Sequence, residues 1–435
     1  MQPESFEARR RRLIDQMGER AVAVIPAAPS AIRNNDVEHE YRQESDFFYL
    51  TGLDEPESVL VLSNVHEEHE AVLFVRPRNP EREIWDGPRA GVEGAVARFG
   101  ADAAFEVKEL DAKLPDYLSN ADRLLYRLGR DRDLDARVLA AIEHARRKHR
   151  FAKDYPTEIV DPGRHLHEHR LRKSADEIDV MRRAADITRE AHLAAMRVAR
   201  PGAYEFEVEA EILRVFRARG SERPAYGSIV GSGPNATILH HRRNDRRMSD
   251  GELLLIDAGC ELDYYASDVT RTFPVSGRFT SEQRVIYELV LAAQERCIEA
   301  VRPGATLEAI HQIAVRELTS GLVELGLVEG PLDEAIEKER YKPFYMHRTS
   351  HWLGMDVHDV GKYFDRGEPR ALEPGMVLTV EPGIYVGADA KADERWRSIG
   401  VRIEDDVLVT ADGHENLTAQ IPKKPAELER ILAER

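Results

Sequence analysis

The sequence predicts an α+β protein of two domains, a smaller α/β domain over residues 1–172 and a larger domain over residues 173–435. Three observations predict it. A chain of 435 residues is longer than one hydrophobic core usually supports. The first third alternates short apolar runs with charged amphipathic segments. The remainder contains one pattern twice: a helix, an Arg-Pro-Gly stop, another helix and then strands.

The elements of the first domain follow from periodicity. Apolar residues recur at helical spacing over Phe6–Met17 and Leu134–His149. Short runs rich in β-forming residues predict strands at Ala21–Ile25, Phe47–Leu50, Ser58–Leu62, Ala71–Val75 and Arg123–Tyr126. The stretch from Asp154 to Arg172 holds two prolines and three histidines without sustained periodicity, so we expect a connector between two cores there.

The second domain opens with a long predicted helix. Ser174 begins it, because a glutamate three residues later completes a capping box, and it stops at Arg200-Pro201-Gly202. Another helix begins at Thr280, with a glutamine as the reciprocal cap, and stops at Arg302-Pro303-Gly304, 102 residues after the first stop. We predict two similar halves with strands in the middle, helices outside and a central cleft. Chance recurrence of a common helix stop is the alternative.

Charge and cysteine content exclude several classes of protein. The formal net charge of −17 argues against nucleic-acid or anionic-membrane partners, which require clustered basic residues. The basic run Arg146–Arg150 is typical of a solvated helix face. Cys260 and Cys297 alone make no disulfide framework. Residues 1–16 are too charged for a signal peptide, and no apolar run is long enough to span a membrane, so we expect a cytoplasmic protein.

Five residues indicate a hydrolytic site with two metal ions. They are Asp257, Asp268, His351, Glu381 and Glu404. Four hard carboxylate donors and one imidazole suit divalent manganese, cobalt, zinc or iron, and two such ions ~3.5–4 Å apart can hold a hydroxide between them.

The aspartates belong to a predicted hairpin. Gly251–Ala258 is an apolar strand, Gly259–Asp263 is turn-like and Tyr264–Thr272 resumes as a β-rich run. If Asp257 is directly opposite Asp268, the Cβ atoms lie ~4.5–5.5 Å apart, so one carboxylate can chelate an ion and the other bridge two. Burying an unpaired carboxylate at the end of an apolar strand is costly, which favours a functional role for Asp257.

One glutamate is predicted to end a strand and the other to lie within one. Glu381 follows the apolar run Met376–Val380 and precedes Pro382-Gly383, which should break the strand. In the stretch from Gly400 to Asp406, alternation places Arg402 and Glu404 on one face. For each glutamate alone, a surface or salt-bridge role is the alternative; together with the aspartates they favour a metal site.

Three histidines fall within twelve residues, at positions 347, 351 and 358. A core would not place so many imidazoles together, because each buried ring needs partners for two nitrogens. One of them can ligate metal while the others donate to substrate and to a tetrahedral oxyanion. His240, seventeen residues before Asp257, is a weaker candidate.

The chain resembles the aminopeptidase P (Xaa-Pro aminopeptidase) family of bacteria, metallopeptidases with the creatinase or pita-bread fold. The resemblance covers nearly the whole chain and is strongest from 231 to 422. The blocks that carry it are Ile256–Glu261, Ser267–Pro274, Ser350–Gly354, Val380–Gly383 and Val401–Asp405, with Asn35-Asp36 and Tyr41–Gly52 resembling the family's non-catalytic domain.

The resemblance implies roles for individual residues. Asp257 would chelate one ion, Asp268 and Glu404 would bridge both, and His351 and Glu381 would complete the second, with Glu381 also handling the proton of the water. His358 would stabilise the carbonyl oxygen, and His347 with Arg402 would line a proline pocket. His240 matches a substrate contact and Tyr385 a nearby hydroxyl. Asp36 and Trp85 match positions that reach a neighbouring subunit's site in tetrameric relatives.

The implied reaction releases the first residue of a peptide whose second residue is proline. Proline has no backbone N–H to grip, so a shape-selective ring pocket is expected. The implied cofactors are two divalent ions, usually manganese, with zinc or cobalt as alternatives, and the implied assembly is a homotetramer or homodimer. A prolidase acting on Xaa-Pro dipeptides is the nearest alternative. A metal-free creatinase-like hydrolase and a non-catalytic interaction module on the same fold are the others.

Overall fold

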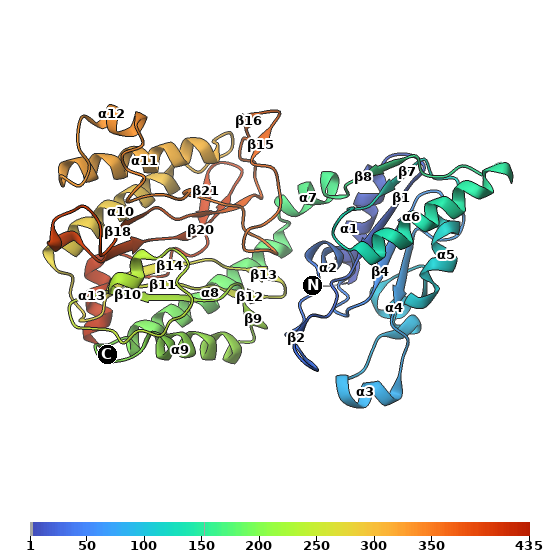
Figure 1. Cartoon of the computed structure of the whole chain (residues 1–435), viewed down its shortest axis with the longest axis horizontal. Helices are drawn as coiled ribbons and strands as arrows, with labels where there is room; N and C mark the ends of the chain where they lie inside the picture. The colour runs from blue at the N-terminus through green and yellow to red at the C-terminus, as the bar shows by residue number, and fades with distance from the viewer. Residues whose placement is uncertain (1–2, 152) are drawn as a thin grey trace. The chain divides into compact units, whose positions relative to one another are not determined.

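The computed structural model describes residues 3–151 and 153–435. The chain divides into two compact units, the first ending at His169 and the second beginning at Arg170 (Figure 1). None of the helices in these described ranges is both long and apolar enough to cross a membrane.

The first unit is built on a six-stranded mixed sheet with strand order β6-β5-β4-β1-β7-β8. Val61 and Phe74 of these strands share one apolar core with Leu114 and Val138 of the helices that cover the sheet. The strands are β1 (Ala21–Pro26), β4 (Val59–Ser63), β5 (Ala71–Val75), β6 (Ala103–Glu106), β7 (Arg123–Leu125) and β8 (Glu158–Val160), with a separate hairpin of β2 (Ile32–Asn34) and β3 (Val37–Glu38). The helices are α1 (Pro3–Gln16), α2 (Ser45–Thr51), α3 (Pro80–Asp86), α4 (Gly91–Phe99), α5 (Leu110–Tyr117) and α6 (Arg132–Arg147), and α7 (Gly163–Leu171) crosses the division.

One predicted strand of the first unit is wrong. Residues 47–50 belong to the helix α2. The Glu44 carboxylate caps this helix by accepting a hydrogen bond from Phe47 N (2.8 Å), and Gly52 ends it in the left-handed conformation, with φ of 66°. These end signals outweigh the β propensity of the aromatic residues between them. The expected connector, residues 154–172, contains β8 and α7.

The second unit repeats one arrangement of helices and strands, as predicted. The helices α8 (Ala175–Val198) and α9 (Glu205–Ala218) belong to the first half, and α10 (Ser281–Glu299) and α11 (Leu307–Glu324) to the second. Both predicted capping boxes, at Ser174 and at Thr280, are present. In Figure 1 the strands lie between the two helix pairs.

The two Arg-Pro-Gly stops have the same local structure. Gly202 and Gly304 both have positive φ, 90° and 84°, which glycine adopts without strain. Gly202 N donates to Met248 O (2.9 Å), and Gly304 N donates to Leu372 O (2.9 Å). Isolated β-bridges follow at the same spacing, Tyr204 with Arg247 and Thr306 with Ala371. The repeat is therefore structural and not a chance recurrence of a helix stop.

The strands of the second unit form several small sheets. Their orders are β10-β11-β14, β13-β12-β9, β17-β20-β21, β18-β19 and β15-β16. The bounds are β9 (Arg223–Pro224), β10 (Ile229–Ser232), β11 (Leu253–Asp257), β12 (Cys260–Leu262), β13 (Tyr265–Ala266), β14 (Thr270–Pro274), β15 (Phe364–Asp365), β16 (Glu368–Pro369), β17 (Val377–Val380), β18 (Gly383–Val386), β19 (Ile399–Arg402), β20 (Asp405–Val409) and β21 (His414–Asn416). The short helix α12 (Leu332–Glu337) and the C-terminal helix α13 (Pro425–Ala433) complete the unit.

The predicted hairpin around Asp257 exists, but its register and its turn differ from the prediction. β11 pairs with β14 so that Asp257 lies opposite Thr270, not opposite Asp268. The expected turn contains β12, which leaves for another sheet and pairs with β13 and β9. The departure is at Gly259, where a Cβ atom would lie 1.8 Å from Ser267 O, so a side chain does not fit.

The predicted strand through Glu404 is also interrupted. β19 ends at Arg402 and pairs with β18, whereas β20 begins at Asp405 and pairs with β17. Glu404 lies between them, and its backbone N–H donates to Thr270 O (3.1 Å). Pro382, expected to end the strand at Glu381, breaks it only briefly, because β18 starts at the next residue.

A fully buried ion pair joins the two halves beside these strand ends. Arg271 Nη2 donates to Asp405 Oδ1 (2.7 Å), and both side chains have zero exposed fraction. Further Arg271 nitrogens donate to the carbonyl oxygens of Glu404 (2.7 Å) and Pro422 (3.0 Å). Each donor of this buried cation therefore has an acceptor close by, as burial requires.

Arg271→Ala should lower the free energy of unfolding of the second unit by about 3–5 kcal/mol, because it removes one of the two cations on the buried Asp405 carboxylate, leaving only Lys423, and takes the donor from buried backbone carbonyls. The matched control is Arg182→Ala, which removes a surface pair with Glu415 whose side chains are 43% and 40% exposed and should cost less than about 1 kcal/mol. Denaturant unfolding measures both; equal losses would contradict the assigned role of Arg271.

Candidate metal centre

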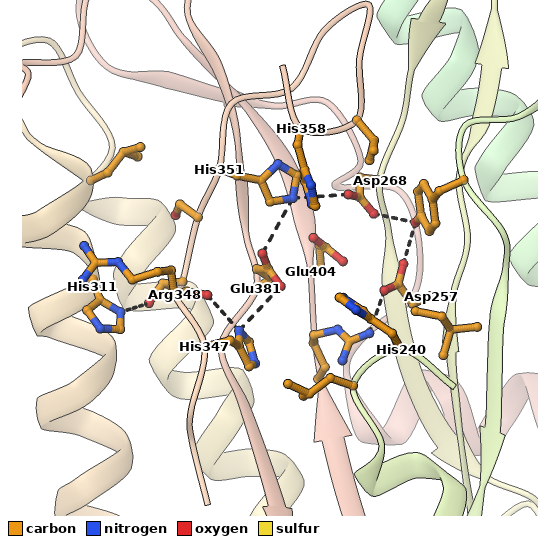
Figure 2. A pocket seen from close by; sticks show the side chains of 18 of the residues that line it. His240, Asp257, Asp268, His311, His347, Arg348, His351, His358, Glu381 and Glu404 are labelled. Atoms are coloured by element: carbon orange, nitrogen blue, oxygen red, sulfur yellow. Dashed lines mark hydrogen bonds and ion pairs between the residues drawn. The ribbon is translucent and has the colours of Figure 1, made fainter. Parts of the chain in front are cut away.

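The second unit contains a cavity of 840 Å³ lined by all five residues expected to hold metal (Figure 2). Four of them come to it from strand ends in both halves, and His351 comes from the segment between α12 and β15. Asp257 ends β11 and Asp268 precedes β14, while Glu381 follows β17 and Glu404 lies between β19 and β20. One oxygen or nitrogen atom each of Asp268, His351 and Glu404 lie within 4.8 Å of one another, close enough to hold one ion.

Asp257 and Asp268 meet at a tyrosine hydroxyl. Tyr226 OH is within hydrogen-bond distance of Oδ1 of both aspartates. A hydroxyl has one proton, so it donates to only one of them at a time. Burial and the two aspartates raise the pKa of Tyr226 well above its ordinary value, so the hydroxyl keeps that proton. The two carboxylates thus lie side by side although they are not opposite each other in the sheet.

His351 presents one nitrogen to the acidic side chains. Its Nδ1 lies 3.0 Å from Trp352 O and donates to it, so Nε2 is the nitrogen that faces the carboxylates. Burial alone would lower the pKa of His351, but Asp268 and Glu381 raise it to about 9, so without metal Nε2 is protonated and a bound cation would replace that proton. Nε2 is 3.4 Å from Asp268 Oδ2 and 3.7 Å from Glu381 Oε1. A backbone carbonyl on one ring nitrogen with the other facing the carboxylates is the usual arrangement of a metal-ligating histidine.

The positively charged side chains near the carboxylates do not neutralise all of their negative charge. Burial and the neighbouring Asp268 and Glu381 raise the pKa of Glu404 well above its ordinary value. Burial raises the pKa of Glu381 to about 7, although His351 and Arg402 oppose the shift. Burial likewise raises the pKa of Asp268. Divalent cations would reverse these shifts, and hard oxygen donors with one imidazole suit them, so the donor set fits a metal centre.

Arg402 organises the wall next to this cluster. Its Nη2 donates to Asp257 Oδ2 (2.6 Å), its Nε to Thr270 Oγ1 (3.0 Å) and its Nη1 to Tyr385 OH (3.0 Å). Thr270 Oγ1 in turn donates to Glu404 Oε2 (2.6 Å). Arg402 itself is almost fully buried, at 3% exposed, so it holds Asp257 rigidly while its guanidinium borders the cavity.

His347 has a defined tautomer. Tyr385 OH accepts from Arg402 and so donates to His347 Nε2 (2.8 Å), which leaves Nδ1–H to donate to Arg348 O (2.8 Å). Burial and the Arg402 charge lower the pKa of His347 to about 3, so the ring is neutral. Because both nitrogens are engaged, the ring offers its face to the cavity.

His240 and His358 also line the cavity, on the side nearer the aspartates (Figure 2). The ring centroids of His358 and His351 are 4.4 Å apart in a T-shaped arrangement. The next residue in the chain after His240, His241, points instead to Glu205, with Nε2 3.1 Å from Oε2.

Glu205, His241 and Asp245 are close enough to hold an ion, but the cluster is structural. The buried Glu205 carboxylate accepts hydrogen bonds from Ser232 N (2.7 Å), Asn235 Nδ2 (3.1 Å) and Arg246 N (3.0 Å). These bonds anchor the loop that carries His240 and use the oxygen lone pairs that a cation would need.

Asp36 and Trp85 belong to the first unit. Both side chains are exposed, Trp85 on α3 at 83%. Their expected place at a neighbouring subunit's site stays a prediction.

Three residues in or next to the cavity were not predicted from the sequence. Tyr226 lies three residues before β10 and offers no periodic signal, and Thr270, which contacts Arg402 and Glu404, reads as an ordinary strand threonine. His311 comes from α11, where its Nδ1 lies 2.8 Å from Thr349 Oγ1. Only Thr270 had an available signal, since it shares the strand face of Asp268 two residues earlier.

Family comparisons agree with this arrangement. Residues 179–411 match the metallopeptidase family M24, and residues 6–126 match the aminopeptidase P N-terminal domain. The Xaa-Pro aminopeptidase of Escherichia coli is 46% identical over 99% of this chain and 97% of its own length.

Solved structures are similar over the full length. Aminopeptidase PepP of Pseudomonas aeruginosa has a TM-score of 0.97 at 52% identity, covering 100% of this chain and 98% of that one. A zinc-substituted E. coli aminopeptidase P in complex with product has a TM-score of 0.96 at 45% identity, covering 100% and 99%. The chain therefore belongs to metallopeptidase family M24, with the pita-bread catalytic domain and an aminopeptidase P N-terminal domain.

Proposed function

We propose that the protein is an Xaa-Pro aminopeptidase, a metal-dependent hydrolase that releases the first residue from peptides with proline in second position. The observation that carries the proposal is the convergence of four carboxylates and one imidazole on an 840 Å³ cavity. The chain's relatives over nearly full length are named for this activity. We further propose that it acts in the cytoplasm as a homotetramer or homodimer.

In this proposal Asp257, Asp268, His351, Glu381 and Glu404 hold two divalent ions, which we take to be manganese. Asp268 and Glu404 would supply carboxylate oxygens to this centre from opposite halves. When bound, the ions supply Lewis acidity and lower the pKa of an attacking water. Glu381 takes the proton of that water and delivers it to the proline nitrogen, which must be protonated to leave.

The histidines act on the substrate. His358 donates a hydrogen bond to the carbonyl oxygen as it gains charge. Burial and the nearby His351 lower the pKa of His358, and a neutral imidazole still has one N–H to donate. His347 and Arg402 form the proline pocket, stiffened by Tyr385 behind them, and His240 contacts the substrate. The pocket grips the ring, since proline offers no N–H. We propose that Asp36 and Trp85 serve a neighbouring subunit's site.

Purified protein supplied with manganese should hydrolyse an Xaa-Pro-Xaa tripeptide and leave the matched Xaa-Ala-Xaa tripeptide almost intact, because only proline fills the ring pocket. Release of the first amino acid, followed by chromatography, measures this. Preference for an Xaa-Pro dipeptide over the tripeptide would indicate a prolidase instead. No hydrolysis of either, with no stoichiometric metal, would indicate a non-catalytic module.

Glu404→Gln should reduce turnover by orders of magnitude in manganese, because it replaces a metal-binding carboxylate with a neutral amide of similar shape. In protein treated with a chelator, the same change should raise the thermal midpoint at neutral pH. The sign follows from the pKa: a buried carboxyl whose pKa is raised by folding destabilises the folded state when it ionises. Calorimetry with and without manganese tests both signs, and a midpoint lowered in chelator would contradict the assignment.

His358→Ala should lower kcat by about 10²–10³-fold, the usual cost of removing one oxyanion donor. The metal content should stay near that of the unchanged protein, since His358 lies beside the cluster and not within it. Elemental analysis of the purified variant provides the control. Loss of bound metal would mean that the ring is a ligand and not a substrate contact.

A further inference from the structure

His358 has no polar partner to orient its ring. Among the described residues its imidazole contacts the ring of His351, with centroids 4.4 Å apart, and makes no hydrogen bond or ion pair. The side chain is exposed toward the cavity that it lines. A group that must meet a carbonyl oxygen within a few tenths of an ångström therefore depends on its backbone for its position.

The next residue, Asp359, is held on both carboxylate oxygens. Arg170 Nη2 donates to Oδ1 (2.6 Å) and Lys173 Nζ donates to Oδ2 (3.0 Å). The three side chains are 1% or 2% exposed. Such a buried cluster keeps its geometry because any separation leaves a charge without a partner in a medium of low dielectric constant.

The backbone at Gly354 packs closely against the cluster of Asp359, Arg170 and Lys173. A Cβ atom on Gly354 would lie 2.1 Å from Asp359 Oδ2 and 2.8 Å from Lys173 Cε. Asp359 N also donates to Trp352 O (2.9 Å), which closes the loop that carries His358. On the other side, Lys173 N donates to Gly375 O (2.8 Å), just ahead of β17.

The two cations favour the ionised form of the Asp359 carboxyl. Burial alone would raise the pKa of Asp359, but the charges of Lys173 and Arg170 outweigh it and lower that pKa below its ordinary value. Arg170 belongs to the last turn of α7 and Lys173 lies between α7 and α8, so the junction between these helices holds the His358 loop.

We propose that Asp359, held by Arg170 and Lys173, is a positioning residue that fixes the His358 imidazole over the scissile carbonyl. The proposal rests on the proposed peptidase function. It differs from a purely structural role because it acts through one named side chain, and that difference can be measured.

The experiment compares Asp359→Asn and Lys173→Met, each alone and combined with His358→Ala, in the full chain with manganese. Each single change should lower kcat between about tenfold and 100-fold with little change in KM, since a group that supports a catalytic side chain has effects of that size. In the His358→Ala background neither change should lower kcat further, because the ring to be positioned is absent.

The matched control is Glu261→Gln, which disrupts another largely buried ion pair, that of Arg223 Nη1 with Glu261 Oε1, in which neither residue belongs to the loop that carries His358. It should lower the thermal midpoint without the loss of kcat. Crystal structures of Asp359→Asn and Lys173→Met should show the His358 ring displaced while the metal content is unchanged.

The outcomes separate the two proposals. An unmodified chain that does not cleave Xaa-Pro-Xaa overturns the peptidase function itself. If the unmodified chain is active, multiplicative losses in the His358→Ala background, or an unmoved ring, overturn the positioning role. If Asp359→Asn does not fold, Lys173→Met by itself tests the positioning role. This variant keeps the ion pair of Arg170 with Asp359, so it should disturb the fold less.

Discussion

The central constraint on the second unit is the electrostatic repulsion among four carboxylates buried around one cavity. The cavity is lined by Asp257, Asp268, Glu381 and Glu404. The pKa values of the last three are raised, which reflects the free-energy cost of ionising them in this buried site. Arg402 and His351 offset part of it. The remaining negative charge is what divalent cations bind, so the feature that destabilises the empty protein is the same one that gives it affinity for metal.

The two halves meet at this cluster through contacts that are as much structural as functional. Arg402 reaches from the second half to Asp257 in the first, and Thr270 reaches from the first half to Glu404 in the second. The buried pair of Arg271 with Asp405 lies one residue beyond each of the last two. Metal binding and the association of the halves therefore stabilise each other, since both hold the same strand ends together.

Around the ligands, histidines are oriented in three different ways. His351 is oriented by a backbone carbonyl, and His347 by a chain of hydrogen bonds that begins at Arg402. His358 has neither, and its place is set by the charged cluster on Asp359. Each arrangement matches the role proposed for the ring: a ligand needs a fixed tautomer, a pocket wall needs a fixed plane, and a substrate contact needs free nitrogens.

The sequence by itself determined the features that depend on neighbours along the chain. Helix starts at Ser174 and Thr280, the repeated glycine stops, and the carboxylates and histidines that stand out from their neighbours in sequence are local patterns with local causes. Only the tertiary structure decided the pairing of Asp257 with Thr270, the departure of β12 at Gly259 and the placement of Tyr226 between two aspartates. The reason is physical: these features arise from close packing between segments tens of residues apart, and periodicity along the chain carries no record of which distant atoms come into contact.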